Sequence, residues 1–125
     1  MKVERIVPNL TVTDLGAAVQ QHTAVLGLEV VMNHGWIVTL ADAAGHQLSL
    51  MTRDATATVN PDVSIFVDDV HAAFESAKAA GVEIVHPLTD EDWGVTRFFY
   101  RDASGRVVNL GSHTTRSGGR STPGT

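Results

Sequence analysis

The chain has 125 residues, of which 43% are hydrophobic and 18% are charged, and its formal net charge at pH 7 is -5. This balance is typical of one globular domain, and the acidic charge disfavours nucleic acid as a partner, because phosphate binding needs clustered Lys and Arg. The absence of cysteine excludes disulfides and thiolate metal sites. With no apolar run long enough to span a membrane and no signal peptide at the start, we expect a cytoplasmic protein without a membrane partner.

The first half of the chain shows the pattern of one strand, one helix and three more strands. Alternating polar and apolar side chains from Asn9 to Val12 predict a half-buried strand, and Asp14 then stands where its carboxylate can cap a helix. The apolar stripe of that helix comprises Leu15, Ala18, Val19, His22 and Leu26. Gly27 ends the helix, since a left-handed cap favours glycine. Strands are then predicted at residues 28–32, 36–41 and 47–51.

The second half repeats this order. A strand around Ser64 to Val67 precedes Asp69, which can cap a helix with an apolar stripe of Val70, Ala73, Phe74 and Ala77. Further strands are predicted at residues 82–86, 96–101 and 107–111, and "RDASGRVVNL" (101–110) repeats "ADAAGHQLSL" (41–50). We therefore predict one domain over residues 1–111, made of two tandem βαβββ modules at about 3–52 and 62–111 with a linker at 53–61. Residues 112–125 are predicted to be a disordered polar tail.

Two segments resemble a known family. "VTDLGAAVQQHTAVLGLEVV" (12–31) is similar to the first helix and strand of the vicinal oxygen chelate superfamily, and "DWGVTRFFYRDASGRVVNL" (92–110) is similar to the closing segment of glyoxalase/bleomycin resistance proteins. The resemblance implies an α+β fold, in which the paired modules form a cupped mixed sheet with the helices on its outer face. Because that superfamily holds dioxygenases, glyoxalases and antibiotic-binding proteins, it implies no single activity.

The resemblance also indicates where a metal would be bound. Enzymes of the superfamily place one metal ligand on the first strand and one on the last strand of each module, and these places fall here at Val7, Ser49, Asp62 and Asn109. A divalent metal prefers imidazole or carboxylate, so Val7 cannot serve and the neutral Ser49 and Asn109 are poor ligands. Only Asp62 could serve well, and one good ligand of four does not make a site. We therefore expect neither a metal nor another cofactor, and the resemblance is to the metal-free, antibiotic-binding type.

Alternation along strands and pairing across hairpins predict which side chains face into the cup. Counting across the two hairpin loops places Phe98 opposite Asn109 and Val38 opposite Ser49, with Trp93 at the mouth of the cavity. The predicted ligand-binding residues are Asn9, Trp36, Val38, Gln47, Ser49, Met51, Ser64, Phe66, Trp93, Phe98, Tyr100 and Asn109. Such an aromatic and apolar lining with a few neutral hydrogen-bonding groups suits a flat, apolar organic ligand.

These features predict a binding protein: a homodimer that sequesters an aromatic or apolar natural product, such as an antibiotic, in clefts at its subunit interface. No catalytic residues are predicted, because the lining holds no nucleophile–base pair and no carboxylate dyad. One alternative is a glyoxalase-like lyase or isomerase, either metal-free or using unusual ligands such as His34 and Asp62, with His34 as an acid–base group. Another is an interaction module without a small ligand, which a closed, fully packed cup would support. Phe66 and Phe98 could equally line a cavity or a dimer interface.

Overall fold

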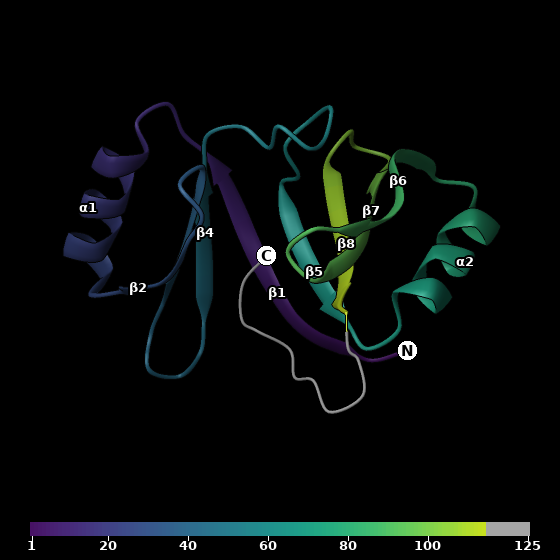
Figure 1. Cartoon of the computed structure of the whole chain (residues 1–125), viewed down its shortest axis with the longest axis horizontal. Coiled ribbons are helices and arrows are strands. Elements are labelled where there is room, and N and C mark those ends of the chain that lie inside the picture. The colour runs from purple at the N-terminus through teal and green to yellow at the C-terminus, as the bar shows by residue number, and fades with distance from the viewer. Residues whose placement is uncertain (115–125) are drawn as a thin grey trace. The chain divides into compact units, whose positions relative to one another are not determined.

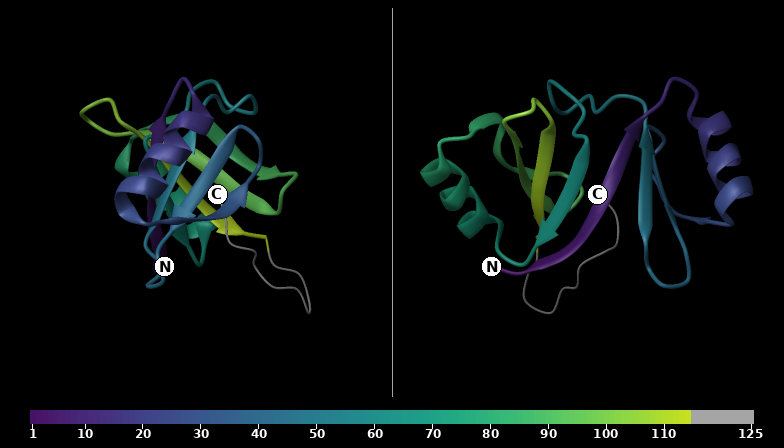
Figure 2. Two further views of the ribbon diagram at one scale, coloured as in Figure 1. Left: turned by 90° about the vertical axis from the view of Figure 1, so that its left-hand side faces the viewer. Right: turned by 180° about the vertical axis from the view of Figure 1, so that it is seen from behind.

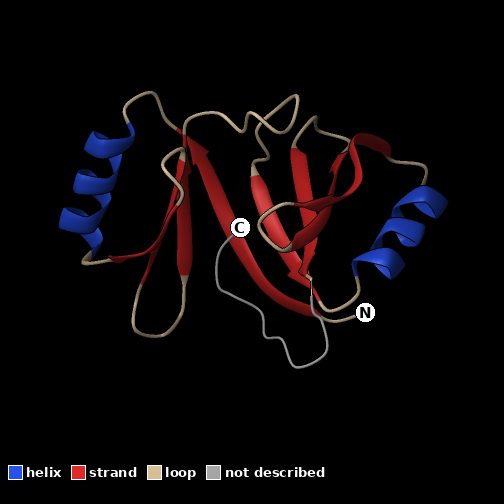
Figure 3. Ribbon diagram, viewed as in Figure 1, coloured by secondary structure: helices blue, strands red, loops and turns tan. Residues whose placement is uncertain are grey.

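The computed structural model describes residues 1–114, and this part of the chain contains two helices and eight strands (Figure 1). Along the chain they follow the order of one strand, one helix and three strands, twice over. Figure 3 distinguishes the helices from the strands by colour. The described elements separate into two compact units, here named the first unit (residues 7–60) and the second unit (residues 1–6 together with residues 61–114). The α+β class and the repeated βαβββ order are confirmed. No helix among the described residues is long and apolar enough to cross a membrane.

The first unit packs one helix against four strands. The elements are β1 (Val3–Thr11, from Val7 onward in this unit), α1 (Leu15–Leu26), β2 (Glu29–Asn33), β3 (Ile37–Ala41) and β4 (Gln47–Met51). The strand order is β2-β3-β4-β1, with β1 parallel to β4 and the other pairs antiparallel. Asp14 caps α1 by accepting a hydrogen bond from the backbone N–H of Ala17 at 3.0 Å. The helix covers the buried strand residues Val38, Leu40 and Leu50.

The second unit repeats this arrangement with longer strands. The elements are β5 (Val63–Val67), α2 (Val70–Ala80), β6 (Glu83–Glu91), β7 (Val95–Arg101) and β8 (Val107–His113). The strand order is β5-β8-β7-β6, and β5 is parallel to β8. Helix α2 begins after Asp69 and ends at Gly81, whose φ of 73° is the left-handed conformation that glycine adopts without strain. In Figure 2 each helix lies along one face of the strands of its own unit.

The N-terminal residues belong to the second unit, although the sequence places them at the start of the first module. The backbone N–H of Lys2 donates to Asp68 Oδ1 at 2.8 Å, and the N–H of Asp68 donates to the carbonyl oxygen of Lys2 at 3.0 Å. The other end also differs, because β8 continues to His113, two residues beyond the predicted strand, and Thr114 N–H bonds to the Gly94 carbonyl oxygen at 2.7 Å. The rest of the predicted tail, residues 115–125, lies outside the described residues.

In the last hairpin of each unit, β3–β4 and β7–β8, the pairing register differs by one residue from the prediction. Thr39, and not Val38, pairs with Ser49, and Phe99, and not Phe98, pairs with Asn109. Because side chains alternate along a strand, a one-residue shift moves every side chain to the opposite face. The predicted face of β3 and β7 was therefore wrong, whereas that of β4, β5 and β8 was right.

The physical reason for the shift is a glycine in each loop. The backbone N–H of Asp102 bonds to the carbonyl oxygen of Arg106 at 2.9 Å, and Gly105 stands between them with a φ of 88°. This is a three-residue loop in which a left-handed glycine adds a bulge, so that Asp102 rather than Arg101 opposes Arg106. The first unit uses the same geometry, with Gly45 at a φ of 88°.

Candidate functional site

The strand face turned away from the helix in each unit is named the cup face. In the first unit the hydroxyl oxygens of Thr39 and Ser49 lie 2.7 Å apart, and the β1–β4 register places Asn9 beside Ser49. Met51 continues this face and packs in an apolar cluster with Met32, Ile37 and Trp36. The cup face of the first unit is thus apolar, with neutral hydrogen-bonding groups at its centre.

Asn109 is the central polar residue on the cup face of the second unit. Its side chain is 2% exposed, and its Nδ2 donates to Ser64 Oγ at 3.0 Å. Among the described residues, nothing hydrogen bonds to Asn109 Oδ1. A buried carbonyl oxygen without a donor costs about 1–3 kcal/mol, so this atom favours a ligand or a water that donates a hydrogen bond to it.

Three of the predicted lining residues lie on the other face, which corrects the prediction. Val38 packs beneath α1, and Phe98 and Tyr100 pack beneath α2. Phe98 is completely buried, and its ring meets that of Phe74 edge-on at a centroid distance of 5.0 Å. The cause is the hairpin register, and the residues that occupy the corresponding cup-face positions are Thr39 and Phe99. The glycine three places after each loop Asp is the sequence signal that would have identified them.

The other predicted residues lie on the cup face or beside it. In the first unit they are Asn9, Trp36, Gln47, Ser49 and Met51, and in the second unit they are Ser64, Phe66, Trp93 and Asn109. Trp93 occupies the turn between β6 and β7, where its ring lies 5.0 Å from the guanidinium of Arg97. Whether these residues bind a ligand stays a prediction.

Phe66 is covered by two side chains that the sequence did not suggest. The guanidinium carbon of Arg5 lies 4.1 Å from the centre of the Phe66 ring, and the His113 ring stacks on Phe66 at 5.2 Å with an interplanar angle of 7°. Arg5 Nη2 also lies 3.0 Å from His113 Nε2. Burial, and then the positive charge of Arg5, lower the pKa of His113, so the neutral imidazole accepts the hydrogen bond. Burial likewise lowers the pKa of Arg5.

This arrangement predicts a stability that depends on pH. Because the folded-state pKa of His113 lies below the unfolded value of about 6.5, the unfolded chain binds more protons between those two values. The stabilisation is therefore complete above about pH 6.5 and is lost as the pH falls towards the folded-state pKa. Urea unfolding at a series of pH values should show this decline, and His113→Gln should flatten it. Equal pH slopes for the two proteins would contradict the assignment.

A second buried cluster joins β6 and β7. Arg97 Nε donates to Glu91 Oε2 at 2.5 Å, and His86 Nε2 lies 3.0 Å from the same oxygen. The guanidinium of Arg97 also lies 4.8 Å from the Phe99 ring, and Arg97 is only 4% exposed. His86 is thus oriented by a carboxylate, whereas His34, the predicted acid–base residue, is exposed. Sequence alone suggested no partner for His86.

The residues at the four expected metal positions do not fit a divalent cation. Val7 is buried and has no donor atom, while Asp62 Oδ2 accepts a hydrogen bond from the backbone N–H of Val107 at 2.8 Å. Ser49 and Asn109 take part in the neutral hydrogen bonds described above. Within residues 1–114, no three His, Asp or Glu side chains gather as a metal-binding group. Asp62 is the one carboxylate among the four positions and there is no imidazole, so this donor set is too poor in the ligands that zinc and similar metals prefer.

Comparison with known proteins identifies a family match and solved structures with a similar fold. The model of the glyoxalase/bleomycin resistance protein/dioxygenase superfamily matches residues 2–110. A solved member of that superfamily from Vibrio splendidus 12B01 superposes with a TM-score of 0.70 at 19% identity, covering 89% of this chain and 99% of that chain. Methylmalonyl-CoA epimerase from Mycobacterium tuberculosis gives a TM-score of 0.66 at 18% identity, with coverage of 90% and 88% respectively.

A further solved structure is described as NAD-dependent benzaldehyde dehydrogenase from Legionella pneumophila. It gives a TM-score of 0.72 at 14% identity and covers 88% of this chain and 100% of that chain. The chain matches none of the curated proteins. At these identities the solved structures establish the fold and leave the activity open.

Proposed function

We propose, from the premise that this chain belongs to the glyoxalase/bleomycin resistance protein/dioxygenase superfamily, that it binds and sequesters a small aromatic or apolar molecule without a metal. One observation carries the proposal. At two of the four places where the superfamily's metal enzymes hold ligands, this chain has the neutral Ser49 and Asn109, which hydrogen bond to Thr39 and Ser64 respectively. Such groups orient a ligand but supply neither a metal site nor a strong base.

The surroundings of these pairs indicate the chemistry of the ligand. Met32, Ile37 and Met51 form an apolar surface beside Ser49, and thioether side chains adapt to ligands of different shapes. In the second unit the Phe99 ring lies opposite Asn109 across the hairpin. Each surface by itself suits a ligand with a flat apolar body, and Asn109 Oδ1 in the second unit favours one that also carries a hydrogen-bond donor.

Fluorescence titration tests the proposal, because the two tryptophans, Trp36 and Trp93, both adjoin the cup face. We expect a panel of aromatic natural products to include members that change the emission saturably and bind equally well in EDTA. Trp36→Phe and Trp93→Phe assign the signal to one unit. If no member of the panel changes the emission, or if EDTA abolishes binding, the proposal is wrong.

A matched variant tests the role of Asn109. We expect Asn109→Leu to weaken binding of a phenolic ligand roughly 10-fold, which corresponds to about one hydrogen bond. Binding of the methyl ether of that ligand should change little, because the ether has no donor for Oδ1. Equal losses for both ligands would indicate that Asn109 acts only through packing with Ser64.

We further propose that the protein is a homodimer. The edge strand β2 exposes two consecutive valines, since Val30 is 48% and Val31 is 46% exposed. Exposed apolar edge strands are typical pairing surfaces. Light scattering should give a dimeric mass, and Val31→Lys should give a monomer while Thr23→Lys on α1 leaves the mass unchanged. A monomeric wild-type protein would refute this part of the proposal.

A second candidate function is a metal-free lyase or isomerase, favoured by the His86–Glu91 contact at 3.0 Å. A carboxylate that orients an imidazole is a common arrangement for proton transfer. Deuterium exchange into methylmalonyl-CoA, the substrate named for the Mycobacterium tuberculosis protein of the same fold, is a direct probe. Exchange that is lost in His86→Gln and kept in His34→Gln would favour this function over sequestration.

A further inference from the structure

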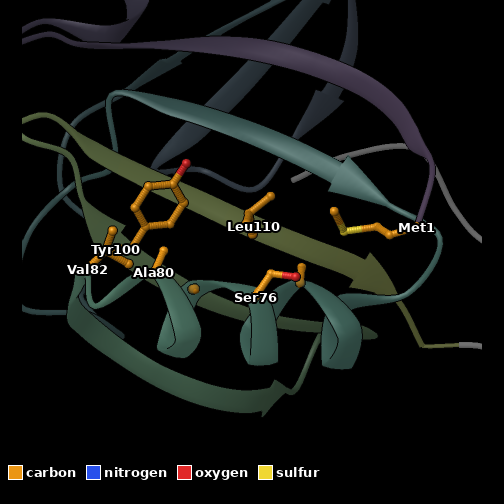
Figure 4. Close-up of a pocket in the computed structure, with 8 residues that line it drawn as sticks. Met1, Ser76, Ala80, Val82, Tyr100 and Leu110 are labelled. Carbon is orange, nitrogen blue, oxygen red and sulfur yellow. The ribbon is translucent and has the colours of Figure 1, made fainter.

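A cavity of about 220 Å³ lies in the second unit on the face opposite to the cup face (Figure 4). Ala73, Ser76, Ala77 and Ala80 of α2 form one wall, and Tyr100 of β7 lies across from them. The remaining lining residues are Met1, Val82 and Leu110. The lining is thus mostly apolar, with the hydroxyl groups of Ser76 and Tyr100 as its polar atoms.

The internal repeat shows that α2 carries smaller residues than α1 along the wall of the cavity. Aligning the two helix caps, Asp14 and Asp69, matches Ser76 with Gln21 and Ala80 with Val25. The same alignment matches Ala77 with His22. Each of these α2 residues is smaller than its counterpart in α1; of the three counterparts, Gln21 and Val25 are exposed and only His22 is half-buried.

The strand residues beneath α2 are also less well covered than those beneath α1. In the first unit Leu40 and Leu50 are completely buried. Their counterparts, Tyr100 and Leu110, are only partly buried. Apolar surface left uncovered forgoes about 25 cal/mol per Å² of burial, so a molecule that covers Tyr100 and Leu110 gains that contribution.

We propose that this cavity binds a monocyclic aromatic molecule that carries one hydroxyl group. An enclosed apolar cavity of about 150 Å³ takes up benzene, and this pocket, which is open to solvent on one side, has about 220 Å³ and therefore room for one substituted ring. The ring covers Tyr100 and Leu110, and its hydroxyl group bonds to Ser76 or Tyr100. The site is separate from the cup face, because the strands of the sheet lie between the two.

The test uses the full chain, with p-cresol as the probe and ¹⁵N-resolved NMR as the readout. We expect saturable shifts of the amides of Ala77, Ala80 and Leu110, with no comparable shifts of Ser49 and Asn109. The double variant Ser76→Gln/Ala80→Val installs the first unit's residues and should weaken p-cresol binding at least five-fold. Ala79→Val, on an exposed position of α2 outside the cavity lining, is the matched control and should bind as the wild type does.

Two results would overturn the proposal. One is a set of shifts that maps to the cup face or is absent, and the other is equal binding by the wild type and the double variant. Tyr100→Phe tests the hydroxyl contact separately, since it should reduce the preference for p-cresol over toluene without abolishing toluene binding. Because the tryptophans do not line this cavity, failure here leaves the fluorescence test of the cup face unaffected.

Discussion

Phe98→Ala should lower the free energy of unfolding by about 3–5 kcal/mol, because it removes a buried aromatic ring and leaves a cavity. Phe98 is 0% exposed and packs on Val67, Val70 and Ala73, with its ring edge-on to Phe74 at 5.0 Å. Urea unfolding followed by circular dichroism measures the loss.

Two variants make this expectation decisive. Phe98→Leu keeps most of the volume and should cost less than half as much, so it stays folded even where the alanine variant does not. Val25→Ala, at a position 76% exposed, should change stability by no more than about 0.5 kcal/mol. Since Phe98 faces α2, the leucine variant should keep any ligand binding at the cup face. If Phe98→Ala were stable but no longer bound ligand, Phe98 would contact the ligand at the cup face, and its assignment to the core beneath α2 would be wrong.

Arg97→Met should be the other strongly destabilising change, with a cost of about 3–5 kcal/mol, because it leaves the Glu91 carboxylate buried without its main counter-charge. The two side chains are 4% and 8% exposed, and the Arg97 Nε to Glu91 Oε2 distance is 2.5 Å. Methionine keeps the packing against Trp93 and Phe99, since thioethers pack well on aromatic rings. The loss therefore reports charge rather than volume.

A double-mutant cycle separates these contributions. Arg97→Met/Glu91→Leu should be more stable than Arg97→Met alone, because removing both charges removes the unpaired carboxylate. The matched control is the exposed Lys78–Glu75 pair, with a distance of 3.1 Å and side chains 51% and 71% exposed. Lys78→Met should change stability by less than about 1 kcal/mol. Equal effects of Lys78→Met and Arg97→Met would show that burial does not govern the Arg97–Glu91 pair.

The helices could be predicted from the sequence because their boundary signals are local. Asp14 and Asp69 each bond to a backbone N–H three residues ahead, and Gly27 and Gly81 adopt the left-handed conformation at the other end. The predicted apolar stripe of α1 was less accurate at its C-terminal end, since Leu26 in the last turn is 59% exposed. Local caps define where a helix begins and ends, but packing decides which of its residues are covered.

The polar clusters could not be predicted because their members are distant in sequence. Arg5 and His113 are separated by 108 positions, and their contact depends on residues 1–6 joining the second unit. His86, Glu91 and Arg97 are closer together, but two irregularities in the β6–β7 pairing bring them into contact. The periodicity of hydrophobic residues along a strand does not indicate where the pairing register with its neighbour shifts.

The sequence by itself determined the α+β class, the duplicated βαβββ order, the superfamily and the absence of a good metal ligand at three of the four expected metal positions, Val7, Ser49 and Asn109. These depend on local caps, periodicity and residue identity, which can be read along the chain. Only the tertiary structure decided which side of β7 faces the cup. It also decided that Arg97 pairs with Glu91 and that His113 pairs with Arg5. The cavity between α2 and the residues Tyr100 and Leu110 is likewise seen only in the structure. Each of these depends on strand register or side-chain volume across the sheet, where one left-handed glycine or a few small helix residues change which atoms meet.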